Sequence, residues 1–159
     1  MTSHKKTNAM RILDSAGISY EIQTYEYRED QLDAMTAAEA MGVECGKVFK
    51  TIVMRTDANM LCVFCVPSCV EVNLKKARLV CGAKTVQPVR PQELMPLTGY
   101  LRGGCSPIGM KHQFPTYIDE SAILYPSIHV SAGVRGVQLV IAWEDLIRIT
   151  GARLCDLSL

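Results

Sequence analysis

The sequence predicts a single α+β domain in which short helices surround a mixed, curled or barrel-like β-sheet. The chain has 159 residues, which is enough for one domain with a full hydrophobic core. Hydrophobic residues make up 48% and charged residues 21%, as in ordinary globular proteins. Several short strand-like segments are interrupted by single helical ones, without the regular βαβ rhythm of a doubly wound sheet. No repeat or linker divides residues 1–159, so we expect one domain.

Local patterns predict the elements of the first half of the chain. Alternation of polar and apolar residues indicates strands, and alanine-rich or amphipathic stretches that end at glycine indicate helices. In order, these are a helix over 5–16 with Thr2 or Ser3 as its cap and Gly17 at its end, a strand over 19–25, a helix over 30–42, and strands over 47–55 and 60–66. The turn over residues 56–59 separates the last two strands, which we therefore expect to form a hairpin.

The second half mixes short helices with further strands. Asn73 is a good N-cap residue and Gly82 a good terminator, and together they indicate a helix between them. The predicted elements are a helix over 74–81, a strand over 84–89, a helix over 91–97, strands over 115–119, 127–133 and 137–142, a helix over 143–149, and a strand over 153–157. Residues 99–109 are rich in glycine and are expected to form a loop.

The charge balance limits the partners that this chain can have. Lys and Arg total 17 against 16 Asp and Glu, for a formal charge of +1. A broad nucleic-acid surface normally requires a strong basic excess, so we expect no DNA binding and only a small, local contact with RNA. The longest apolar run, residues 60–66, is far shorter than the roughly 20 residues of a membrane helix. We therefore expect no membrane insertion, and the first residues do not resemble a secretory signal.

Cysteine usage indicates a reducing compartment. The chain has seven cysteines, an odd number, and without an export signal we expect reduced thiols in a cytoplasmic protein. The spacing of Cys62, Cys65 and Cys69 could also suggest a metal or redox site. However, a zinc site usually needs a second ligand pair, which is missing. We interpret the segment as a core strand in which cysteine packs as a small hydrophobic residue, and we expect no metal.

Lys50 is the first residue that departs from a simple core pattern. Period-two spacing places it on the same face of its strand as Ile52 and Met54. A lysine on an apolar face is costly to desolvate unless it meets an anion or a cavity. Two interpretations remain open. Either the alkyl part of the side chain lies on the apolar face while the ammonium reaches solvent, or the ammonium has a functional role.

Two glycine-bearing segments are the next candidates. Glycine lacks a Cβ atom, so residues 99–109 could bring backbone N–H groups close to an oxyanion or phosphate, although the spacing of a nucleotide P-loop is absent. Cys105 lies in this loop and His112 and His129 follow it, but nothing in the sequence brings these side chains together as a nucleophile pair. Residues 131–136 form either a second site loop or a plain hairpin turn.

Five segments occur in the order typical of one protein family. They are YEIQTY at 20–25, VFKT at 48–51, the glycine block with Lys111 at 99–111, PTYID at 115–119 and SAGVRG at 131–136. In combination they resemble the YbaK/EbsC family of free-standing aminoacyl-tRNA deacylases, which are related to the editing domain of bacterial prolyl-tRNA synthetases. The glycine block together with the upstream Phe-Lys-Thr is the specific part, and the Cys-tRNA(Pro) deacylase branch is the most similar.

The resemblance implies a barrel-like α+β fold and a pocket for the aminoacylated 3′ end of tRNA, with no cofactor. It assigns Lys50 as the family lysine, which we expect to anchor the terminal nucleotide or the ester. The expected catalytic residues are Lys50, Gly103 and Gly104, and the expected substrate-binding residues are Tyr25, Thr51, Ser106, Ser131, Arg135 and Gln138. In this branch the thiol of the substrate itself is proposed to attack the ester, so that no protein nucleophile is needed.

Two departures from the branch leave the choice of amino acid open. Gln138 stands where the branch has aspartate, and Val134 stands where it commonly has lysine. A deacylase for Ala-tRNA(Pro) or another mischarged tRNA therefore remains an alternative. A second alternative is a non-catalytic module that binds a tRNA end or a synthetase. Prolyl-tRNA synthetase is a candidate partner in either case, because complex formation would raise the local concentration of a weak tRNA binder.

Overall fold

Two β-sheets form the framework of residues 5–158, the part of the chain that this computed structural model describes. One sheet is antiparallel, with strands in the order β1 (Glu21–Thr24), β7 (Val137–Ala142) and β6 (Ser127–Ser131). The other is mixed, in the order β4 (Val86–Pro88), β2 (Phe49–Thr56), β3 (Leu61–Pro67), β5 (Thr116–Asp119) and β8 (Arg153–Cys155). The α+β class is confirmed, although the strands divide into two sheets.

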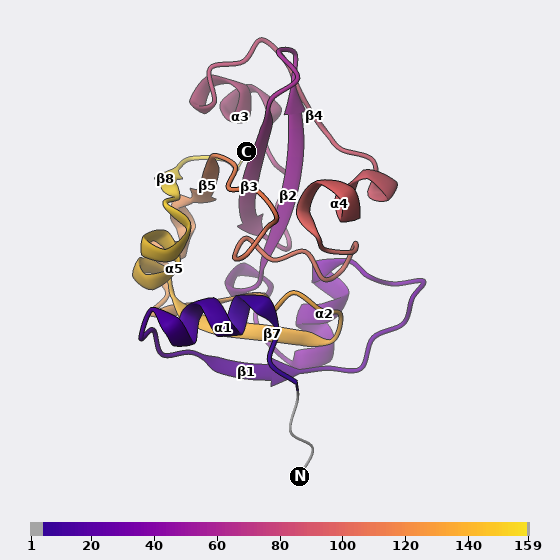
Figure 1. The fold of residues 1–159 in the computed structure, drawn as a ribbon, viewed down its shortest axis with the longest axis vertical. Helices are drawn as coiled ribbons and strands as arrows, with labels where there is room; N and C mark the ends of the chain where they lie inside the picture. The colour runs from indigo at the N-terminus through magenta and orange to yellow at the C-terminus, as the bar shows by residue number, and fades with distance from the viewer. Residues whose placement is uncertain (1–4, 159) are drawn as a thin grey trace.

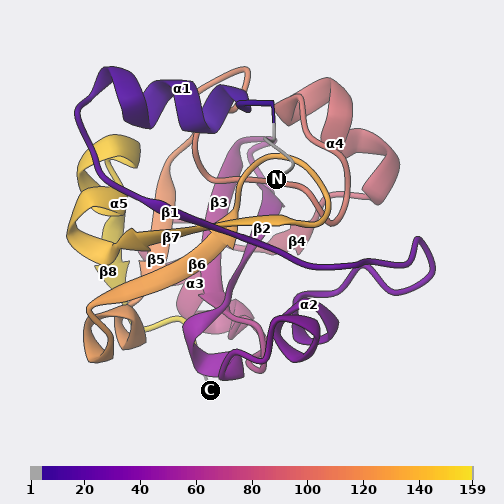
Figure 2. The same cartoon turned by 90° about the horizontal axis from the view of Figure 1, so that it is seen from below.

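The two sheets meet near the start of β2. A parallel bridge pairs Val48 with His129 of β6 and so connects the mixed sheet to the antiparallel one. In Figure 1, β2 and β3 rise from the antiparallel sheet, and Figure 2 shows β1, β6 and β7 from below. The first residues of β2 therefore lie where one sheet approaches the other.

Short helices surround this framework. Figure 1 shows α4 and α5 on opposite sides of the paired strands β2 and β3, with α3 near their far end. The helices are α1 (Asn8–Ser15), α2 (Ala34–Met41), α3 (Leu74–Val80), α4 (Pro91–Thr98) and α5 (Trp143–Thr150), with 3₁₀ turns at η1 (Cys45–Lys47) and η2 (Glu120–Leu124). None of the helices in the described part of the chain has the length and apolar character needed to cross a membrane.

Capping interactions explain several helix boundaries. The helix expected over residues 5–16 begins only at Asn8, because the Thr7 side chain accepts a hydrogen bond from the Met10 N–H and thereby caps it. The caps predicted at Thr2 or Ser3 lie outside the described residues. Gly42 ends α2 in the left-handed conformation, as the sequence indicated.

Strand pairing sets the strand lengths. The hairpin predicted from residues 47–66 is confirmed, with β2 antiparallel to β3. Most of the other predicted strands are shorter than expected, since a strand extends only as far as its partner does. The segment over 19–25 forms a strand only at Glu21–Thr24, where it pairs with β7, and the segment over 84–89 only at Val86–Pro88.

The core consists of two clusters, one on each face of β2. Phe49 and Val53 belong to the cluster that reaches α1 and the antiparallel sheet, while Met54 packs with Phe64 in the other. Cys62 and Cys65 are buried in β3, which confirms the core-strand interpretation of that segment. All seven cysteines are free thiols in the structure.

We expect Asn73→Ala to lower the free energy of unfolding by about 1 kcal/mol, because Asn73 Oδ1 accepts a hydrogen bond from the Lys76 N–H and caps α3. Urea denaturation followed by circular dichroism measures the change. Lys75→Ala, at an exposed position of the same helix, is the matched control and should change stability by less than about 0.5 kcal/mol. Equal stability of Asn73→Ala and the control would contradict the capping role.

Candidate active site

A cavity of about 430 Å³ lies where the two sheets and the glycine-rich loop come together. Its walls come from the first residues of β2, from the start of α2, from the loop after α4 and from the antiparallel sheet. The lining residues are Tyr25, Leu32, Asp33, Ala34, Ala37, Phe49, Lys50, Thr51, Ile52, Pro88, Arg102, Gly103, Cys105, Ser131 and Gln138. Segments far apart in the sequence thus build one site.

The structure brings six of the nine predicted site residues to this cavity. They are Lys50, Gly103, Tyr25, Thr51, Ser131 and Gln138. The other three, Gly104, Ser106 and Arg135, do not line it. Their contacts place them in the loops that form the cavity rim.

Lys50 extends from β2 into the cavity wall. Its side chain is 22% exposed, and its Nζ lies 3.9 Å from Oε1 of Glu71. The Glu71 side chain is 88% exposed, so this ion pair is solvated and weak. A lysine whose side chain is mostly buried and whose partner is so loose can offer its ammonium to an anionic or carbonyl group of a ligand.

Gly103 forms a turn that lies next to Leu32, just before α2, and both residues line the cavity. Its φ is +84°, in the left-handed region, and a Cβ atom here would lie 3.0 Å from Cβ of Leu32. The Gly104 N–H donates to the Leu101 carbonyl and closes the turn. The loop can adopt this shape at low cost because residue 103 has no side chain.

Gly104 and Arg135 join the two glycine-bearing loops. A Cβ atom on Gly104 would lie 3.0 Å from the backbone nitrogen of Arg135 and from the Val134 carbonyl carbon. The Arg135 Nε donates to the Arg102 carbonyl at 2.8 Å. These residues hold residues 101–104 against residues 131–136, so their contacts support the shape of the rim.

Ser106 stabilises the same loop from within. It is buried, and its Oγ accepts a hydrogen bond from the Ile108 N–H at 3.2 Å. Tyr100 donates its hydroxyl hydrogen to the Ile108 carbonyl, and burial raises the pKa of Tyr100 to about 12. The tyrosine of the glycine block therefore remains a hydrogen-bond donor at neutral pH.

Cys105 lines the cavity, but as a neutral thiol. Burial raises the pKa of Cys105 to about 11, so the thiolate that a nucleophile requires is scarce at neutral pH. His129 lies in β6, and His112 lines a separate cavity of about 200 Å³. Neither histidine lines the cavity that holds Cys105, so the lining does not form a Cys–His pair.

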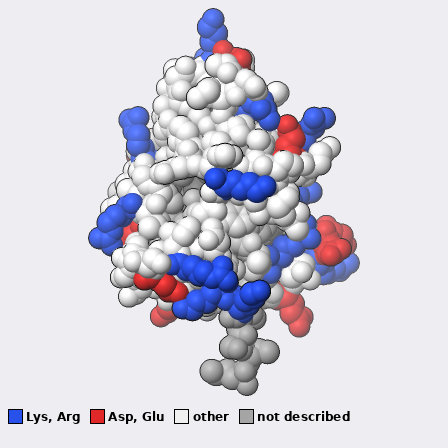
Figure 3. Space-filling view, in the orientation of Figure 1, with Lys and Arg blue, Asp and Glu red and all other residues white. Residues whose placement is uncertain are grey.

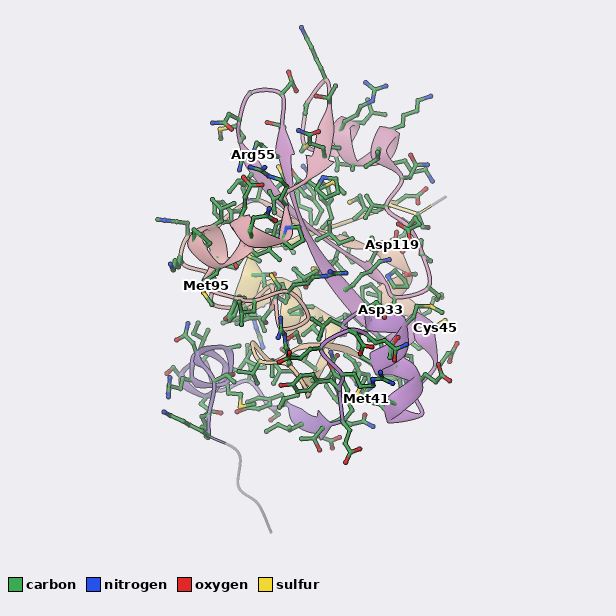
Figure 4. All side chains as sticks on the ribbon, turned by 90° about the vertical axis from the view of Figure 1, so that its right-hand side faces the viewer. Asp33, Met41, Cys45, Arg55, Met95 and Asp119 are labelled. Atoms are coloured by element: carbon green, nitrogen blue, oxygen red, sulfur yellow. The ribbon has the colours of Figure 1, made fainter. Side chains whose placement is uncertain are left out.

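The sequence patterns missed two charged residues of the lining. Asp33, labelled in Figure 4, caps α2. Both of its carboxylate oxygens accept hydrogen bonds from Thr36, which lowers the pKa of Asp33. Arg102 is exposed within the glycine-rich loop. Arg102 could have been found from the sequence, because it is a basic residue followed directly by two glycines. Asp33 gave no such signal, because an aspartate before a helix is explained by its capping role.

Comparisons with known proteins agree on one family. The model of the aminoacyl-tRNA editing domain family matches residues 29–149. EbsC of Enterococcus faecalis, a proposed Cys-tRNA(Pro)/Cys-tRNA(Cys) deacylase, is 40% identical over 98% of this chain and 95% of its own length. A proline–tRNA ligase of Shouchella clausii is 34% identical over 52% of this chain and 14% of its own length.

A solved structure supports the same relationship. The crystal structure of a proposed trans-editing enzyme for prolyl-tRNA synthetase superposes with a TM-score of 0.82, at 25% identity, over 98% of this chain and 99% of the other. The fold and the family relationship thus define an aminoacyl-tRNA deacylase. The chain belongs to the aminoacyl-tRNA editing domain family.

Proposed function

We propose that the protein is a trans-editing enzyme that removes cysteine from mischarged Cys-tRNA(Pro) and that it also acts on Cys-tRNA(Cys). The observation that carries this proposal is the meeting of the Lys50 ammonium, the Gly103 turn and the buried amide of Gln138 in one cavity. The similarity to EbsC supports cysteine as the amino acid. The Lys50 and Gly103 positions, predicted from the resemblance, are proposed to act on the ester itself.

The dimensions and charge of the site suit the end of a tRNA. A cavity of about 430 Å³ falls within the usual range for small ligands and can hold an aminoacyl group with part of its terminal nucleoside. In Figure 3, basic and acidic side chains are interspersed with wide uncharged areas on the visible face. A net charge of +1 and this scattered pattern fit a local contact with the acceptor end.

Lys50 and the glycine turn would supply most of the catalysis. An aminoacyl ester is already activated, so holding the reacting groups in place and stabilising the developing oxyanion can account for much of the acceleration. We propose that Lys50 binds the terminal nucleotide or the ester oxygen. The backbone around Gly103 and Gly104 would approach the ester closely, because these residues have no side chain. Tyr25, Thr51 and Ser131 would bind the nucleoside and the acyl group.

A substrate-assisted route fits the chemistry of the lining. The substrate thiol loses its proton and its sulfur attacks the ester carbonyl carbon; the bond from that carbon to the ribose oxygen breaks, and the ribose oxygen takes up a proton. The products are cysteine thiolactone and free tRNA. Cys105, with a pKa of about 11, is held as a thiol and is not needed as a nucleophile.

Prolyl-tRNA synthetase is the partner that we propose. The segment shared with a proline–tRNA ligase shows that related domains occur in such enzymes. A weak tRNA binder gains affinity when a synthetase holds the same tRNA, because the second contact becomes intramolecular. We place this activity in the cytosol, where tRNA is aminoacylated.

A substrate panel tests the function. We expect the purified protein to deacylate Cys-tRNA(Pro) and Cys-tRNA(Cys) at least about 10-fold faster than Ala-tRNA(Pro) under single-turnover conditions, since alanine lacks the attacking thiol. Mass spectrometry of the released product distinguishes thiolactone from free cysteine. A preference for Ala-tRNA(Pro) would identify an alanine deacylase instead, and tRNA binding without turnover of any mischarged tRNA would identify a non-catalytic module.

A further inference from the structure

Gln138 has an unsatisfied amide in the wall of the cavity. The residue lies in β7, opposite Ser131 of β6, and is 5% exposed. Its Oε1 atom is buried and has no hydrogen-bond partner among the residues that the structure describes. Buried side-chain amides nearly always have partners, so an exception that lines a cavity indicates a ligand that supplies one.

Several other polar groups of the lining already have hydrogen-bond partners or cannot accept a hydrogen bond. The two carboxylate oxygens of Asp33 accept hydrogen bonds from Thr36. Ser131 Oγ accepts from the Gly133 N–H. Lys50 carries a positive charge and can only donate. Among the buried side-chain oxygens of the described residues, Gln138 Oε1 is the one in this lining that has no partner. Rotation about its broad terminal torsion can turn this oxygen toward the cavity.

The part of the substrate that enters the cavity indicates which ligand group donates to the Gln138 amide oxygen. The acyl group is the terminal part of an aminoacylated tRNA and is therefore the part that enters the cavity, where Gln138 is a buried residue of the lining. The side chain of cysteine offers only a weak S–H donor, whereas the α-ammonium offers strong N–H donors. A hydrogen bond from a charged donor to a buried acceptor is also among the stronger ones.

We propose that the Gln138 amide oxygen accepts a hydrogen bond from the α-ammonium group of the aminoacyl ester. Gln138 thereby makes the site selective for esters of α-amino acids over esters that lack the amine. A neutral acceptor provides this contact without burying a carboxylate when the site is empty. The inference rests on the proposed deacylase function and deepens it, since it states which substrate atom this wall recognises.

The test compares two esters that differ in the amine alone. Cysteinyl-tRNA(Pro) and 3-sulfanylpropanoyl-tRNA(Pro) carry the same thiol at the same position, but the second has hydrogen in place of the α-ammonium. We expect the wild-type protein to prefer the cysteinyl ester by about 10- to 100-fold in kcat/KM. Gln138→Met, which keeps the length of the side chain but has no comparable acceptor, should reduce this ratio by about 10-fold or more; any preference that remains reflects the higher intrinsic reactivity of the cysteinyl ester.

Two further variants make the result decisive. Gln138→Glu retains an acceptor and should keep the preference for the cysteinyl ester. Gln23→Met is the matched control, because Gln23 lies opposite Gln138 on β1 but donates to the Met41 carbonyl and does not line the cavity. Its substrate ratio should equal that of the wild type, and thermal unfolding of each variant checks that the sheet is intact.

The possible outcomes separate this inference from the proposed function. Loss of the preference in Gln138→Met alone supports the contact. Equal loss on both esters, or a wild-type ratio near unity, overturns it while the deacylase function stands. If the wild-type protein turns over neither ester, the proposed cysteine deacylase function and this inference both fail.

Discussion

Lys50→Ala should reduce single-turnover deacylation of Cys-tRNA(Pro) by about 10²- to 10³-fold, the range found when one group that stabilises a developing oxyanion is removed. The reason is the position of Lys50, which lines the cavity and whose ion-pair partner among the described residues is the solvated Glu71, 3.9 Å away. The measurement follows loss of radiolabelled cysteine from tRNA with enzyme in excess, so that product release does not enter the rate.

Two lysine variants control this experiment. Lys50→Arg keeps the charge but replaces a compact ammonium with a planar guanidinium, and should recover only part of the rate. Lys75→Ala removes an exposed lysine of α3 and should leave the rate unchanged. A Lys50→Ala protein that deacylates at the wild-type rate would remove the lysine from the mechanism.

Gly103→Ala should lower the same rate by about 10-fold or more and also destabilise the fold. A residue with a Cβ atom loses roughly 1–2 kcal/mol in the left-handed conformation, and φ at Gly103 is +84°. In addition, the new Cβ atom would lie 3.0 Å from Cβ of Leu32, which also lines the cavity, so the turn or Leu32 must shift.

A second glycine separates backbone strain from the shape of the cavity. Gly42 has φ +67° and no atom within 4 Å of a built Cβ position, and it does not line the cavity. Gly42→Ala should therefore show a similar loss of stability in urea denaturation with an unchanged rate. Equal rates in the Gly103→Ala and Gly42→Ala proteins would mean that the position of the turn does not affect catalysis.

Elements with strong local patterns were predictable from the sequence. The strand predicted over 137–142 has these bounds in the structure, and Asn73 caps α3 as expected. The start of α1 was misplaced because two candidate caps precede Thr7, and a sequence does not show which hydroxyl meets a free N–H group. The division of the strands into two sheets was also not predictable, since it depends on pairing between distant segments.

Local patterns drew attention only to Lys50, which departs from the apolar face of its strand, and to the glycine block that contains Gly103. Four other lining residues were expected from the family resemblance, namely Tyr25, Thr51, Ser131 and Gln138. Arg102 and Asp33 do not conflict with their surroundings, because charged residues are common in loops and at helix N-termini. Their place in the cavity depends on how α2 and the loop after α4 approach each other, which is a matter of tertiary packing.

The cavity draws its groups from two separately paired sheets, with Lys50 on one and Gln138 on the other. If Lys50 anchors the nucleotide or ester and Gln138 contacts the amine, different sheets carry catalysis and recognition of the amino acid. Substitutions in the wall that contains Gln138 could then change the amino acid that is recognised, while the wall that contains Lys50 keeps its catalytic role. Such an arrangement would let one scaffold diversify into editors of several mischarged tRNAs through few replacements.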